Sequence, residues 1–83
     1  MTKQEILDYV MQYVKDNFSE QVKSPAPDTK LLTSKLLDSI NTLHMVSHME
    51  EKFKFEAEAH EVSPDNLDTP DLIAGYIHRK LVS

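Results

Sequence analysis

The sequence predicts an all-α fold, and three observations support this prediction. Apolar residues recur at spacings of three and four in three separate stretches, which keeps one face of a helix apolar. Alternating apolar and polar residues, which are typical of strands, are scarce, whereas good helix formers are plentiful. The chain has 83 residues, so we expect residues 1–83 to form a single small domain.

The first predicted helix spans about residues 3–18. Thr2 and Glu5 form a capping box, in which the threonine caps the helix and the glutamate reaches back to it. The helix has an apolar stripe wide enough to face a core, with Tyr9 and Tyr13 on or beside the solvent-exposed face. The stripe comprises Ile6, Leu7, Val10, Met11, Val14 and Phe18.

Residues 19–37 form a predicted long loop. Pro25 and Pro27 interrupt any helix there, because proline disfavours the helical conformation of the residue before it. A loop of this length in a small domain is usually functional or anchored. We expect three leucines to anchor this one to the core: Leu31, Leu32 and Leu36.

The second predicted helix spans about residues 39–53. Asp38 and Ser39 both belong to the residue types that cap a helix, so either could be the cap. We expect Ile40, Leu43 and Met45 to lie mainly in the core and partly on a docking surface. The apolar residues of the helix are Ile40, Leu43, Met45, Val46, Met49 and Phe53.

The remaining elements follow from turn residues. Residues 54–62 are ambiguous between strand and helix, and we interpret them as an extended connection. Prolines at first helical positions predict a short helix at about 64–67 and a last helix at about 70–81. A close helix contact would be one reason for the glycine at Gly75, inside the last helix.

Composition excludes several classes of function. A net charge of −5 disfavours nucleic acid, whose phosphates need a basic patch. The chain has no cysteine and only one glycine, so it contains neither a cysteine nucleophile nor a glycine-rich phosphate loop. No apolar run could span a membrane and no secretory pattern is visible. We therefore expect a cytoplasmic monomer.

Three short motifs resemble those of acyl and peptidyl carrier proteins: Leu36-Leu37-Asp38-Ser39-Ile40, Glu50-Glu51-Lys52-Phe53 and Thr69-Pro70-Asp71-Leu72-Ile73. The Leu-Leu-Asp-Ser form and the segment after Phe53 look most like those of D-alanyl carrier proteins and related discrete aminoacyl carriers. The resemblance implies a bundle of three main helices plus one short helix. It also implies that Ser39 receives 4'-phosphopantetheine from a phosphopantetheinyl transferase that Asp38 contacts. In the alternative interpretation, Asp38 and Ser39 only cap the helix.

The function implied by the resemblance is that of a discrete carrier and not of an enzyme. The chain would hold an acyl or aminoacyl group as a thioester on the arm, in nonribosomal peptide or polyketide biosynthesis. An adenylating enzyme or acyltransferase would load it, and a downstream synthase or transferase would unload it. D-alanyl carriage for cell-wall polymers and an unmodified helical interaction module are the alternatives.

The resemblance also suggests a partner surface, made of Ile40, Leu43, Glu50 and Glu51. Asn41, His44 and His48 stand where fatty-acid carriers often have acids, which argues against fatty-acyl cargo. These histidines share a helix face, but no nearby third ligand is evident, so we expect no metal site. Asp65, Asp68 and Asp71 only loosely match a calcium loop. Lys35 stands where many relatives have a glycine.

Overall fold

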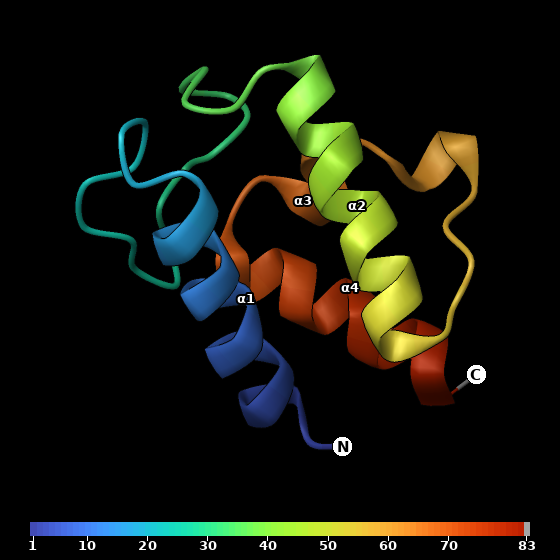
Figure 1. The fold of residues 1–83 in the computed structure, drawn as a ribbon. Helices are drawn as coiled ribbons and strands as arrows, with labels where there is room; N and C mark the ends of the chain where they lie inside the picture. The colour runs from blue at the N-terminus through green and yellow to red at the C-terminus, as the bar shows by residue number, and fades with distance from the viewer. Residues whose placement is uncertain (83) are drawn as a thin grey trace.

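The computed structural model describes residues 1–82, which contain helices and loops but no strand (Figure 1). In chain order the elements are α1 (Lys3–Asn17), α2 (Ser39–Phe53), the 3-10 turn η1 (Ala59–Glu61), α3 (Pro64–Leu67) and α4 (Pro70–Val82). The predicted all-α class is confirmed. Helices α2 and α3 have the predicted bounds, whereas α1 ends one residue earlier and α4 one residue later. No helix within the described range is both long and apolar enough to cross a membrane.

Helix α1 begins with the predicted capping box. Oγ1 of Thr2 accepts a hydrogen bond from the backbone N–H of Glu5 at 3.2 Å, and the Glu5 carboxylate accepts one from the Thr2 N–H at 2.8 Å. The helix ends at Asn17 because Phe18 leaves the helical conformation, with φ −127° and ψ 33°. Phe18 is still buried, so the apolar stripe continues one residue beyond the helix.

The core lies where α1, α2 and α4 meet (Figure 1). Helix α1 packs along α4, and α3 leads directly into α4. Helix α2 contributes long buried side chains, which fill the space between it and the other helices. The largest fully buried side chains are Ile6, Val10, Val14, Leu31, Met45, Met49, Leu67, Pro70, Ile73 and Ile77.

The long loop between α1 and α2 is anchored by apolar side chains, as predicted. Leu31 is fully buried, and Leu32 and Leu36 pack partly buried against the core. Val22 and Leu37, which were not predicted anchors, are also buried. The loop that leads to the start of α2 is therefore part of the folded domain.

The connection after α2 is extended only in its first part. Lys54 ends the helix in the left-handed conformation, at φ 59°. Residues 59–61 then form η1, so the prediction of a fully extended segment over 54–62 is wrong. The turn is stabilised locally, because the Glu61 carboxylate accepts a hydrogen bond from the backbone N–H of Glu58 at 3.0 Å.

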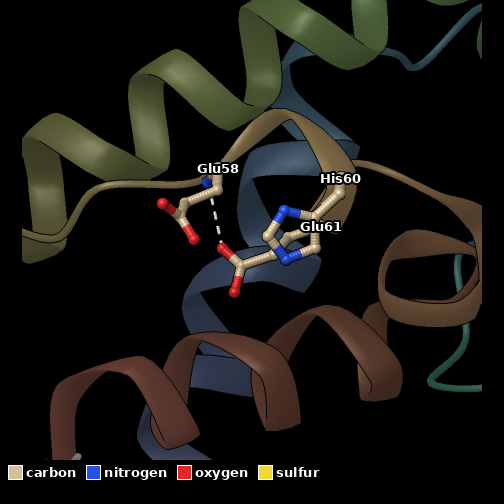
Figure 2. A group of neighbouring side chains, drawn as sticks. All are labelled: Glu58, His60 and Glu61. Carbon is tan, nitrogen blue, oxygen red and sulfur yellow. Dashed lines mark hydrogen bonds between the residues drawn. The ribbon is translucent and has the colours of Figure 1, made fainter.

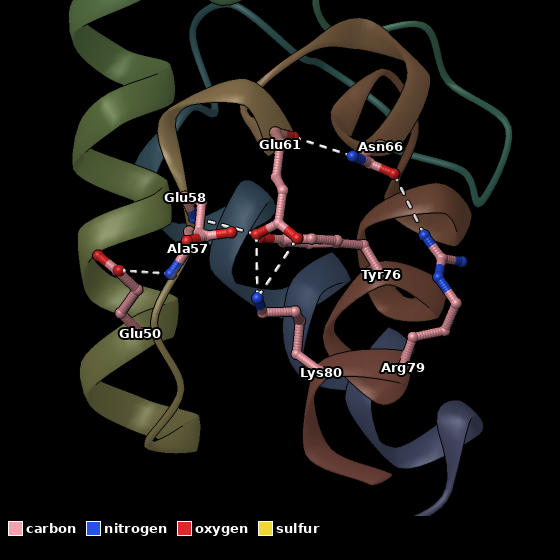
Figure 3. Close-up of polar contacts among 8 residues, drawn as sticks. All are labelled: Glu50, Ala57, Glu58, Glu61, Asn66, Tyr76, Arg79 and Lys80. Carbon is pink, nitrogen blue, oxygen red and sulfur yellow. Dashed lines mark hydrogen bonds and ion pairs between the residues drawn. The ribbon is translucent and has the colours of Figure 1, made fainter. Parts of the chain in front are cut away.

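Glu61 also joins this connection to α4 (Figure 3). Its Oε1 accepts hydrogen bonds from the Tyr76 hydroxyl at 2.9 Å and from Nζ of Lys80 at 3.0 Å. Three hydrogen-bond donors lower the pKa of Glu61 to about 2: the N–H of Glu58, which has the largest effect, the Lys80 ammonium and the Tyr76 hydroxyl. Burial raises the pKa of Tyr76, and the neighbouring Glu61 carboxylate raises it further. The network therefore fixes the connection at the edge of the core.

Gly75 does not mark a close helix contact. A Cβ atom at this position would meet the Arg79 guanidinium at 3.6 Å and the Lys3 side chain at 3.7 Å. Both distances are ordinary van der Waals contacts with the ends of flexible side chains. The packing of α4 therefore does not require a glycine.

Candidate functional site

Asp38 caps α2, and Ser39 is the first helical residue. Oδ1 of Asp38 accepts a hydrogen bond from the N–H of Asn41 at 2.8 Å, and its carbonyl accepts one from the N–H of Thr42 at 2.9 Å. The sequence left open whether Asp38 or Ser39 is the cap, and the structure shows that it is Asp38. Ser39 is exposed on the first turn, at the positive end of the helix dipole.

A groove of about 390 Å³ opens beside Ser39. Its walls come from the first turns of α2, from residues 62–64 at the start of α3, and from the loop leucines Leu32 and Leu37. The lining combines these apolar side chains with the hydroxyl-bearing Thr42 and Ser63. The Ser39 hydroxyl is therefore accessible to a reagent, and the groove can hold a slender group of mixed polarity.

Ile40 and Leu43 lie on the surface, with 64% and 55% of their area exposed. The expectation that they lie mainly in the core is wrong. Met49 lies in the middle of the buried face of α2. Successive helical residues are rotated by about 100° around the axis, so Ile40 lies about 180° and Leu43 about 120° away from Met49. That face is formed by Thr42, Met45, Val46, Met49 and Phe53. We call the exposed pair Ile40 and Leu43 the apolar patch.

The two glutamates at the end of α2 differ in their surroundings. Oε2 of Glu50 accepts a hydrogen bond from the N–H of Ala57 at 2.8 Å, which ties the connection to α2 (Figure 3). Glu51 is exposed. Of the two predicted partner contacts, Glu50 thus has a structural role within the chain, and Glu51 lies open to an incoming molecule.

Most of the net negative charge of the chain comes from one segment, residues 50–65. Residues 50–65 contain six acidic residues and two lysines, a net charge of −4 out of the total of −5. The first turn of α2 contains no acidic residue. Apart from the exposed Asp38 carboxylate, which also lines the groove, the first turn of α2 is therefore uncharged, whereas the opposite end of α2 and the following connection are acidic.

Asp68 holds the loop that leads to Ser39, a role that the sequence did not indicate. Its Oδ1 accepts hydrogen bonds from the N–H groups of Leu32 and Thr33 at 3.0 and 2.9 Å, and Oδ2 accepts one from the Thr33 hydroxyl at 2.8 Å. Burial raises the pKa of Asp68, but the hydrogen bonds from Thr33 and Leu32 outweigh this effect and lower it overall. These oxygens bind donors of the protein itself, so a calcium loop at this position is not supported.

Lys35 adopts the left-handed conformation, with φ 63°. A lysine is strained there, because its Cβ approaches the following carbonyl, whereas glycine has no such cost. The chain then turns back, and the N–H of Leu37 donates to the carbonyl of Leu31 at 2.9 Å. The backbone at Lys35, where the resemblance to carrier proteins leads us to expect a glycine, is therefore one that favours glycine.

His48 packs against α1. Its ring stacks on Tyr13, with 4.6 Å between ring centroids, and its Nε2 lies 2.5 Å from the Tyr9 hydroxyl. His44 is exposed one turn earlier. Within residues 1–82 neither histidine belongs to a group of three or more side chains that could hold a metal ion. His48 therefore contributes to the contact between α1 and α2.

Glu58, His60 and Glu61 do bring three possible metal ligands within 4.8 Å of one another (Figure 2). Lys80, however, already forms an ion pair of 3.0 Å with Glu61. The Tyr76 hydroxyl and the Glu58 N–H donate to the same carboxylate. The geometry of this group is therefore explained by its role in anchoring η1 to α4.

A comparison with protein-family models finds no match to this sequence, and no curated protein matches it either. The resemblance to carrier proteins thus remains a prediction from the motifs quoted above. The functional hypothesis depends on the exposed Ser39 hydroxyl, its capping aspartate and the neighbouring groove.

Proposed function

We propose that this chain is a discrete carrier protein with an acyl-carrier-like bundle of three main helices and one short helix. It holds an acyl or aminoacyl group as a thioester on 4'-phosphopantetheine attached to Ser39. The observation that carries the proposal is the exposed Ser39 at the first turn of α2, next to a groove of about 390 Å³. Phosphopantetheine supplies a thiol, a group absent from the side chains of this cysteine-free chain.

The attachment step needs only the hydroxyl and its position from this protein. Oγ of Ser39 forms a phosphodiester bond with the arm, the hydroxyl gives up its proton, and the nucleotide half of coenzyme A leaves. A separate phosphopantetheinyl transferase catalyses this exchange. The Asp38 cap supports the step, because it keeps Ser39 in the first turn, where the helix dipole favours a phosphate.

Partner enzymes recognise the chain through two kinds of contact. The apolar patch of Ile40 and Leu43, which borders Ser39, enters an apolar depression of the partner, because burying these side chains favours association. Glu51 and the acidic residues after it attract a basic surface, which affects the encounter rate more than the affinity. The partners are the transferase, an adenylating enzyme or acyltransferase, and a downstream synthase or transferase.

The cargo that we rank first is an aminoacyl or acyl group used in nonribosomal peptide or polyketide biosynthesis. D-alanine for cell-wall polymers is the alternative. Both assignments rest on the sequence motifs, since a fold does not by itself specify a cargo. Loading assays with adenylating enzymes, each offered a panel of amino acids that includes D-alanine, distinguish the two.

Intact mass after co-expression with a broad-specificity phosphopantetheinyl transferase tests the attachment. The native chain gains the mass of one arm, and Ser39→Ala gains none. Ser47→Ala is the matched control, because Ser47 is an exposed serine of the same helix. This variant still gains one arm. A folded native chain that stays unmodified with an active transferase would refute the proposal.

A second candidate is an unmodified helical module that binds a partner helix. The exposure of Ile40 and Leu43, at 64% and 55%, favours it, because paired apolar residues on a helix surface often mark a binding site. This candidate predicts that Ser39→Ala retains full binding to the partner. The carrier proposal predicts that the same substitution abolishes function while the fold is retained.

A further inference from the structure

The groove beside Ser39 offers two hydroxyl groups to a molecule that lies in it. Thr42 and Ser63 both line the groove, Thr42 from α2 and Ser63 from the position just before α3. Ser39 lines the same groove, so a chain attached to its hydroxyl begins there. Apart from Asp38, the remaining lining side chains are apolar: Leu32, Leu37, Leu43, Val62 and Pro64.

The Thr42 hydroxyl is an acceptor for a ligand in the groove. Its hydrogen atom is already used, because Oγ1 of Thr42 donates to the carbonyl of Asp38 at 2.7 Å. A hydroxyl has one donor and two acceptor positions, so the oxygen can still accept from an N–H group. Thr42 is only 5% exposed, so burial and this hydrogen bond hold its side chain in place.

The Ser63 hydroxyl can both donate and accept. Ser63 occupies the capping position of α3, where a serine oxygen ordinarily accepts from a backbone N–H of the first turn. Within residues 1–82 its side chain makes no such capping bond. Its backbone is held, because the N–H donates to the carbonyl of Glu61 at 3.0 Å and the carbonyl accepts from the N–H of Leu67 at 2.9 Å. A fixed backbone therefore presents this hydroxyl to the groove.

This pair of hydroxyl groups suits a slender chain that contains amides. An amide N–H can donate to Thr42, and an amide carbonyl can accept from Ser63. The phosphopantetheine arm has this chemistry, since it combines methyl and methylene groups with two secondary amides. Attachment to Ser39 also gives the arm an effective concentration in the millimolar range. Contacts too weak to retain a free molecule can therefore retain the arm.

We propose that Ser63, together with Thr42, holds the arm in the groove between α2 and α3, and that the Ser63 hydroxyl bonds to the arm in place of capping α3. This inference rests on the proposed carrier function. It gives the arm a bound resting state, from which a partner enzyme withdraws it. The two hydroxyl groups act on the arm and take no part in forming the bond at Ser39.

Hydrogen exchange of the two arm N–H groups, measured by NMR on protein that carries a ¹⁵N-labelled arm, tests the proposal. Intact mass first verifies that each variant carries one arm. In the native protein at least one arm N–H should exchange more slowly than in free 4'-phosphopantetheine. Ser63→Ala should speed this exchange by about two- to tenfold, the effect of one hydrogen bond on an equilibrium.

Two variants serve as controls for this measurement. Ser63→Thr keeps a hydroxyl and should retain the slow exchange. Ser47→Ala should retain it too, because Ser47 is an exposed serine of α2 that does not line the groove. Two results would overturn the inference: arm N–H groups that exchange in the native protein as fast as in free 4'-phosphopantetheine, or equal exchange in the native protein and in folded Ser63→Ala.

Urea unfolding distinguishes a bond to the arm from an ordinary cap. A capping serine stabilises the chain whether or not the arm is present. We expect Ser63→Ala to leave the urea midpoint of the unmodified chain unchanged and to lower that of the modified chain. A lower midpoint in the unmodified chain, with no further loss in the modified chain, would show that Ser63 is a cap and would overturn the inference.

A last measurement separates this inference from the proposed function. Free 4'-phosphopantetheine is titrated into the unmodified native chain and into unmodified Ser63→Ala, and the backbone amide signals of residues 42 and 63 are followed by NMR. The native chain should bind it about two- to tenfold more tightly, and equal affinities would overturn the inference. Tighter binding by the native chain, with a Ser39 that an active transferase leaves bare, would refute the carrier function and retain the groove as a site for an amide-bearing chain.

Discussion

Replacing Asp68 with alanine should release the loop that leads to Ser39. The Asp68 carboxylate accepts three hydrogen bonds of 2.8–3.0 Å from Leu32 and Thr33, and the residue is only 5% exposed. A hydrogen bond to a charged group contributes about 1.5–3 kcal/mol. The three bonds share one side chain and do not add, so we expect a loss of about 3–5 kcal/mol. A domain of this size has an unfolding free energy of only about 4–12 kcal/mol.

Urea unfolding at pH 7, followed by far-UV circular dichroism, measures this loss. Asp68→Asn keeps one carbonyl acceptor and should lose less than Asp68→Ala. Asp65→Asn is the matched control, because Asp65 is an exposed acidic residue in the same short segment. It should leave the midpoint unchanged. A loss below about 1 kcal/mol for the alanine variant, which is the average effect of any substitution, would refute the reasoning.

The same contact predicts sensitivity to acid. The pKa of Asp68 is lowered from its ordinary value of 3.8 in the folded protein, so the unfolded chain binds the proton more tightly. The contribution of the Asp68 carboxylate to the free energy of unfolding is therefore complete above about pH 5. It is lost as the pH falls through the lowered pKa of Asp68 in the folded protein. The stability difference between the native chain and Asp68→Asn should shrink between pH 5 and pH 2. A difference that is constant with pH would contradict this account.

Three further substitutions, one of them paired with a control, test individual positions. Lys35→Gly should stabilise the fold by about 1 kcal/mol, since it relieves the left-handed strain. The control Lys52→Gly, within α2, should destabilise the fold by about 1 kcal/mol. Urea midpoints measure both effects, and a destabilising Lys35→Gly would contradict the prediction. Gly75→Ala should add up to about 1 kcal/mol, because a Cβ fits there, and a lower midpoint would show that the site is tighter than described. Leu43→Ala should change stability by less than about 0.5 kcal/mol but raise the KM of the transferase, and an unchanged KM would exclude the apolar patch from docking.

The positions of the helices could be predicted because their signals are local. The Thr2 capping box, the Asp38-Ser39 pair and the prolines at positions 64 and 70 each act within one helical turn. Capping groups and fixed proline angles depend on neighbouring residues only. The predicted bounds of all four α-helices are therefore correct to within one residue.

The buried side of α2 was harder to predict because its apolar residues surround more than half of the helix. Spacing alone could not decide whether Leu43 or Thr42 faces inward. The structure buries Thr42, whose hydroxyl donates to the Asp38 carbonyl at 2.7 Å. Leu43 is left on the surface, where it borders the groove.

The sequence by itself determined the helical class, the helix ends and the serine at the entrance of α2, because backbone capping and apolar periodicity operate over a few residues. Only the tertiary structure decided which residues surround that serine. The contact between Asp68 and Thr33 joins positions 35 residues apart, and no local pattern records such a pairing. The exposed patch beside Ser39 and the filled interior likewise depend on how α1 and α4 pack against α2, since burial is a property of the assembled core.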